Sequence, residues 1–95
     1  MIRNVVMGKL KDGAAREDAE RALAAILALE PEGCVDLRVG LDAGLREGNW
    51  DFAIVGDFVD VASYRRYDED DEHNRIRREM FAPIAETINR IQFEV

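Results

Sequence analysis

Hydrophobic and polar residues alternate in three segments of the chain, as they do in β-strands that bury one side. Residues 2–11 alternate until the turn signal at residues 11–13, and the chain closes with a second alternating run at residues 91–95. Between them, residues 34–41 place Val35 and Val39 on one face and charged side chains on the other. Each segment predicts a strand.

A fourth strand is predicted at residues 50–59, and it differs from the other three. Phe52 and Ile54 would lie on one face while Val55 lies on the opposite face, so both faces are apolar. A strand of this kind needs a cover on each side of its sheet.

Two helical regions separate these strands. Apolar residues recur every three or four positions from residue 19 to residue 29, where Pro31 and Gly33 end the pattern. Asp60 can cap a short helix over residues 61–67, and the acidic run at 68–72 would open another. We expect this last helix to include four isoleucine and methionine residues spaced by four, with either a kink or a shorter last turn at Pro83: Ile76, Met80, Ile84 and Ile88.

The predicted order of elements is βαββαβ, with the second helix in two pieces. This order is that of an α+β, ferredoxin-like domain with a four-stranded antiparallel sheet and helices on one face. A length of 95 residues predicts one domain spanning residues 1–95. Because the helices can cover only one face, we expect a second copy of the chain to cover the other and form a homodimeric α/β barrel, with Val5, Val35, Val39, Val55 and Phe93 buried on one face or the other.

Composition narrows the classes of function. The formal charge of −7 argues against nucleic acid as a partner, and no apolar run approaches the roughly 18 residues of a membrane-spanning helix. Cys34 is the one cysteine, so no internal disulfide can form and we expect a cytoplasmic protein. With a single histidine, His73, the sequence predicts no metal site and no cofactor. A haem or flavin role ranks below the other readings, because His73 would be the sole haem ligand and no phosphate-binding glycine motif is present.

Three segments together resemble the stress-responsive α/β barrel (Dabb) domain family of the dimeric α/β barrel superfamily. They are the opening MIRNVVMGKLKDG, the central GNWDFAIVGDFVDVASYRRY and the later DEHNRIRREMFAPI, so the resemblance covers nearly the whole chain. It implies a dimeric barrel that is a stress-associated, small-molecule-binding protein of unassigned activity. Members of the family include plant polyketide cyclases, so the resemblance also allows an enzyme that needs no cofactor.

The resemblance also implies a site. Tyr67 and His73 fall where the cyclases have a pocket tyrosine and a catalytic histidine, whereas Asn4 and Phe52 stand where those enzymes have two further histidines. In such a site His73 would be the base and Tyr67 an acid or orienting donor, with Asn4 binding a carbonyl. The predicted ligand is a small apolar or carbonyl compound, and the candidate ligand-binding residues are Asn4, Phe52, Tyr64 and Trp50.

Each candidate also has a structural interpretation. His73 could brace the acidic start of a helix, and Tyr64 and Tyr67 could be packing anchors with polar tips. Trp50 could belong to the core or to an interface, and Asn4 could make one ordinary hydrogen bond. The sequence leaves both sets of interpretations open.

Overall fold

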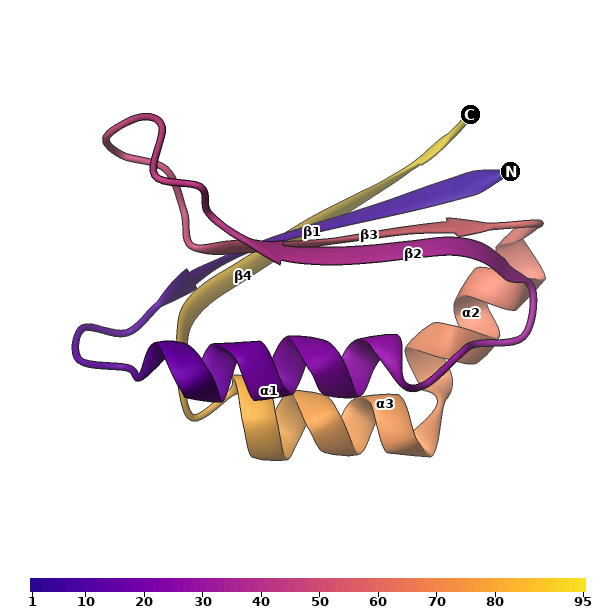
Figure 1. Ribbon diagram of the computed structural model, residues 1–95. Coiled ribbons are helices and arrows are strands. Elements are labelled where there is room, and N and C mark those ends of the chain that lie inside the picture. Colours follow the sequence, from indigo (N-terminus) through magenta and orange to yellow (C-terminus); the bar gives the residue numbers. More distant parts are fainter.

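The computed structural model describes all of residues 1–95 and contains one four-stranded antiparallel sheet with helices on one side (Figure 1). The strand order is β2-β3-β1-β4, so β1 and β3 are the central strands, as in a ferredoxin-like sheet. The elements in chain order are β1 (Ile2–Leu10), α1 (Arg16–Leu27), β2 (Cys34–Leu41), β3 (Phe52–Phe58), α2 (Val61–Glu69), α3 (Asp71–Ile76), the π-helical turn η1 (Arg77–Phe81) and β4 (Ala85–Glu94). The predicted ferredoxin-like α+β fold is confirmed, including the division of the second helix.

The inner face of the sheet, which faces the helices, carries the core. Val6 of β1 and Phe52 and Ile54 of β3 are buried there against Leu23 and Ile26 of α1. Each fully buried side chain of this size stabilises the fold by roughly 1.5–3 kcal/mol. The core is therefore a single layer between the sheet and the helices.

The outer face of the sheet carries an apolar patch beside the Arg3–Asp57 ion pair, and no element of the chain covers it (Figure 1). Strand pairing places Val5 beside Val55 and Ile91, with Met7 and Phe93 on the same side. Ile91 is 61% exposed and Phe93 is 44% exposed. Apolar side chains gathered in this way commonly mark an interaction surface.

The last helix is shorter than the sequence predicts. It ends at Phe81, Pro83 lies in a turn, and Ile88 belongs to β4. The prediction that Ile84 and Ile88 continue the helix was wrong, because Pro83 has no backbone N–H to donate and stops the helix instead of bending it. A spacing of four residues also keeps side chains on one face of a strand, so the pattern could not distinguish the two structures.

Strand β2 departs from strict alternation at its start. Its pairing with β3 shifts between Cys34 and Asp36, and this bulge leaves Val35 57% exposed. Val39 packs against the core, whereas no helix of the same chain covers Val35, whose predicted burial depends on the partner subunit. A bulge inserts one unpaired residue and changes which side chains share a face.

Candidate functional site

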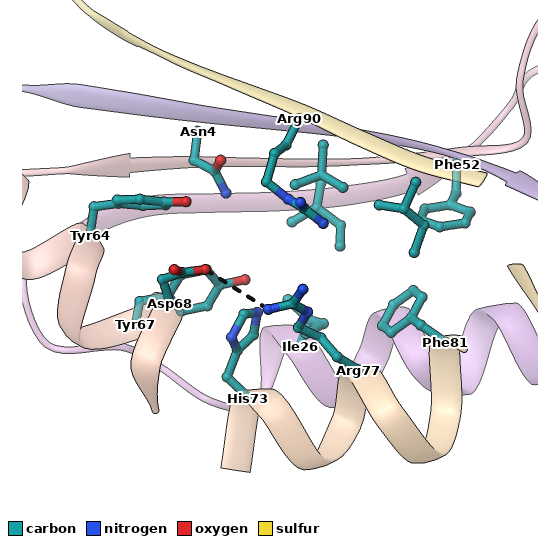
Figure 2. Close-up of a pocket in the computed structure, with 13 residues that line it drawn as sticks. Asn4, Ile26, Phe52, Tyr64, Tyr67, Asp68, His73, Arg77, Phe81 and Arg90 are labelled. Atoms are coloured by element: carbon teal, nitrogen blue, oxygen red, sulfur yellow. Dashed lines mark ion pairs between the residues drawn. The ribbon is translucent and has the colours of Figure 1, made fainter. Parts of the chain in front are cut away.

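A small cavity lies between the inner face of the sheet and the helices that follow β3 (Figure 2). Its volume is about 40 Å³, enough for water or a small chemical group but far below the roughly 300–1,000 Å³ of drug-sized pockets. Phe52 and Phe81 lie at one end and the polar side chains at the other. The apolar lining residues are Val6, Ile26, Phe52, Ile54, Phe81 and Ile88, and the polar group consists of Asn4, Tyr64, Tyr67, Asp68, His73, Arg77 and Arg90.

Two helix caps position Tyr67 and His73. Asp60 begins α2 by accepting a hydrogen bond from the backbone N–H of Ser63 at 2.8 Å, and Asp70 begins α3 by accepting one from the backbone N–H of His73 at 2.9 Å. Tyr67 therefore lies near the end of α2, and His73 lies in the first turn of α3. Their ring centroids are 4.1 Å apart, so the corner between the helices brings the two rings into contact.

His73 is a neutral base in this setting. The residue is 7% exposed, and its Nδ1 is buried without a hydrogen-bond partner. Burial lowers the pKa of His73, and the nearby positive charge of Arg77 lowers it further. The imidazole is consequently uncharged near pH 7 and can accept a proton or a hydrogen bond.

Tyr67 complements His73 as a proton donor. Burial raises the pKa of Tyr67 above its ordinary value, so the phenol keeps its proton. The ring packs against Phe58 with centroids 5.2 Å apart, and the hydroxyl points into the cavity (Figure 2). Tyr67 is thus both a packing anchor and a hydrogen-bond donor at the cavity wall.

Asn4 and Tyr64 complete the polar end of the cavity. Gln92 donates a hydrogen bond from Nε2 to Oδ1 of Asn4 at 2.9 Å, and the amide nitrogen of Asn4 points toward the cavity (Figure 2). The Tyr64 ring meets Phe58 edge to face, with centroids 5.7 Å apart, and its hydroxyl lies on the Asn4 side of the cavity. These groups can hydrogen-bond a ligand oxygen.

Trp50 lies elsewhere. It precedes β3 and lines a separate surface depression with Met7 and Leu41. Strand alternation predicts that Trp50 shares a face with Phe52, but the strand begins at Phe52 and the alternation does not extend into the loop. The structure therefore brings together His73, Tyr67, Asn4, Phe52 and Tyr64, and it leaves Trp50 outside this group.

Three charged residues of the cavity were not foreseen from the sequence: Asp68, Arg77 and Arg90. Nη1 of Arg77 lies 3.9 Å from Oδ1 of Asp68, whereas Arg90 forms no ion pair within the chain. Charged residues on helices and strands are usually exposed to solvent, so the residue type alone does not indicate that a side chain lines a cavity. The available signal was strand alternation, since Arg90 must face the helices if Ile91 faces outward.

The described chain offers neither a metal site nor a membrane helix. No group of three His, Cys, Asp or Glu side chains is placed to hold a metal ion. None of the helices has the length and apolar character needed to cross a membrane.

Comparison with known families identifies the fold family. The family model described as Stress responsive A/B Barrel Domain, Dabb, matches residues 2–95. The chain belongs to the Dabb family. No curated protein matches the chain.

Several solved structures share the fold of this chain. A dimeric ferredoxin-like protein of unknown function from Thermobifida fusca is 25% identical, with 99% of this chain and 90% of that chain covered and a TM-score of 0.89. A Dabb family protein from Mesorhizobium loti is 21% identical, with 99% and 95% covered and a TM-score of 0.80. A hydroxynitrile lyase from Passiflora edulis is 18% identical, with 99% and 92% covered and a TM-score of 0.80. Proteins with this fold thus include an enzyme and proteins of unknown function.

Proposed function

We propose that this Dabb domain, residues 1–95, is a homodimer that binds a small organic molecule in the cavity of each subunit. The observation that supports binding is the buried, unpartnered Nδ1 of His73 in a side chain that lines the cavity. A buried polar atom without a partner costs roughly 1–3 kcal/mol, and functional sites are where such costs are retained. A ligand that forms a hydrogen bond with this nitrogen would remove this cost, because each nitrogen of a neutral imidazole donates or accepts according to the tautomer.

The outer face of the sheet supports the homodimer. It gathers Val5, Met7, Val55, Ile91 and Phe93 without any cover from the chain itself. The protein from Thermobifida fusca is described as dimeric. Two such faces packed together would remove an apolar surface from water and close the α/β barrel. With Cys34 as the one cysteine, we also propose a cytoplasmic location.

The pairing of His73 with Tyr67 supports a second candidate, an enzyme that needs no cofactor. A neutral His73 can remove a proton from the carbon beside a carbonyl, while Tyr67 and the amide of Asn4 hydrogen-bond the carbonyl oxygen as it gains negative charge. The same proton can return from His73 after rearrangement or ring closure. The contact between the two rings, at 4.1 Å between centroids, favours this candidate.

Native mass spectrometry of freshly purified protein tests the proposed function. We expect twice the chain mass together with a small-molecule adduct. Ile88→Phe should fill the cavity, since Ile88 lines it, and abolish the adduct while the dimer persists. Ile88→Leu is the control of equal volume. A monomer without an adduct would contradict the proposal.

Replacing His73 by Ala separates catalysis from binding. If His73 is a base, turnover of a carbonyl substrate should fall by about 10²–10⁴ with ligand affinity nearly unchanged. If it only binds, affinity should change and no turnover should exist in the parent protein. If His73 is a helix brace, thermal stability alone should fall.

A further inference from the structure

Two arginine side chains stand at the open side of the cavity and reach toward it from opposite walls. Arg90 extends from β4 above the cavity, and Arg77 extends from η1 below it (Figure 2). With Phe81 and Ile88, both arginines also line a wider groove of about 610 Å³ outside the cavity. The cavity and the groove therefore share a wall that carries two guanidinium groups, in a chain whose formal charge is −7.

The charges around this entrance sum to one positive charge. In the cavity lining, Arg77 and Arg90 oppose one carboxylate, that of Asp68. The groove adds Asp71 and Arg78, which cancel each other. Arg77 is 3.9 Å from Asp68, at the limit of an ion pair, and Arg90 has no acidic partner. One guanidinium is thus free to bind an anion, and the net charge matches a ligand with a single negative charge.

We propose that the ligand is a small monocarboxylate with a short apolar chain. Its carboxylate would lie between Arg77 and Arg90, where the cavity adjoins the groove of about 610 Å³. Only the end of its chain would enter the cavity, toward Phe52 and Phe81 at the apolar end. Arginine binds carboxylates through paired N–H donors, and such charge-assisted hydrogen bonds are stronger than neutral ones. This assignment rests on the proposed function, because it names the class of molecule that the cavity binds.

Paired compounds test the carboxylate directly. Hexanoate and hexanamide have the same carbon chain, and only hexanoate is charged. Binding followed by calorimetry or by shifts of cavity resonances should be at least about tenfold tighter for hexanoate. Arg90→Gln and Arg77→Gln should each remove most of this preference, whereas Arg16→Gln on the far surface of α1 should leave it unchanged.

Asp68 supplies a change of opposite sign. Asp68→Asn removes the negative charge beside Arg77, so hexanoate should bind several-fold tighter while hexanamide binding stays within about twofold. A damaged fold would weaken the binding of hexanoate, so tighter binding cannot be explained by damage to the fold. Raising the salt concentration should weaken hexanoate binding and leave hexanamide binding unchanged.

The outcomes distinguish the two proposals. Equal binding of hexanoate and hexanamide, unchanged by Arg90→Gln, would overturn the carboxylate assignment and leave small-molecule binding intact. Tighter binding of inorganic phosphate than of hexanoate would also overturn it. If neither compound bound and native mass spectrometry gave no adduct, both proposals would fail.

Discussion

Both faces of the sheet carry clusters of apolar side chains, yet they differ in what surrounds them. The inner face packs Val6 and Ile54 against helices and leaves a small cavity with a polar end. The outer face carries Val55, Ile91 and Phe93 with no cover from the chain. A strand that is apolar on both sides therefore contributes to two surfaces, one that packs against the helices beside the cavity and one that we propose meets a second copy of the chain.

The largest expected effects come from placing the same charge at two neighbouring residues of β3 that face opposite sides of the sheet. Ile54→Asp places a charge in the inner core and should lower the free energy of unfolding by about 4 kcal/mol or more. Val55→Asp places the same charge on the outer face and should split the dimer while the monomer remains folded. Chemical denaturation and sedimentation check both variants, with Ile54→Val and Val55→Ala as controls.

Equal loss of stability from Ile54→Asp and Val55→Asp, with no change in mass for either, would remove the distinction between the faces.

A smaller loss of stability is expected at Gly8 of β1, which pairs with the cavity-lining residue Phe52 on β3. A Cβ added to Gly8 would clash with the Phe52 ring, so Gly8→Ala must displace that ring. Overpacking of this kind costs about 1–3 kcal/mol and should also perturb ligand binding. Gly40 on β2 has open space around its position, and Gly40→Ala is therefore the matched control. An equal loss of thermal stability in Gly8→Ala and Gly40→Ala would contradict the packing of Phe52 against Gly8.

The sequence predicts the strands of this fold well because alternation is a local property. Apolar residues at every second position identify β1 and β2, a run that is apolar on both faces identifies β3, and the order of the elements along the chain limits the topology to very few arrangements. The boundary between η1 and β4 could not be predicted in the same way. Ile84 and Ile88 fit a helix and a strand equally, and the outcome depended on Pro83.

The candidate site was predictable only in part. The contact of Tyr67 with His73 follows from two caps, of which Asp60 is recognisable in the sequence. Arg77 and Arg90 meet across the cavity only after β4 pairs with β1, and no local pattern specifies that pairing. Residues that are distant in sequence and polar in type give little signal until the fold is known.

The buried histidine gives the smallest of these effects, a dependence of stability on pH. The unfolded chain binds a proton at His73 near the ordinary pKa of about 6.5, whereas the folded protein binds it at a lower pH because burial lowers this pKa. Stability from this group is complete above about pH 6.5 and falls as the pH drops toward the folded pKa. In the His73→Gln variant, the free energy of unfolding should differ less between pH 7.5 and pH 5 than it does in the parent protein. A parent protein as stable at pH 5 as at pH 7.5 would contradict a buried neutral imidazole.

Isoleucine-methyl NMR tests the division between the two faces most directly, because β4 carries Ile88 on the inner face and Ile91 on the outer face. Hexanoate should shift the Ile88 methyl resonance and leave that of Ile91 in place. A soluble gadolinium chelate should spare Ile91, which is 61% exposed in the single chain but would be covered in the dimer. Strong broadening of Ile91 by the chelate, together with an Ile88 resonance that does not respond to hexanoate, would contradict the account.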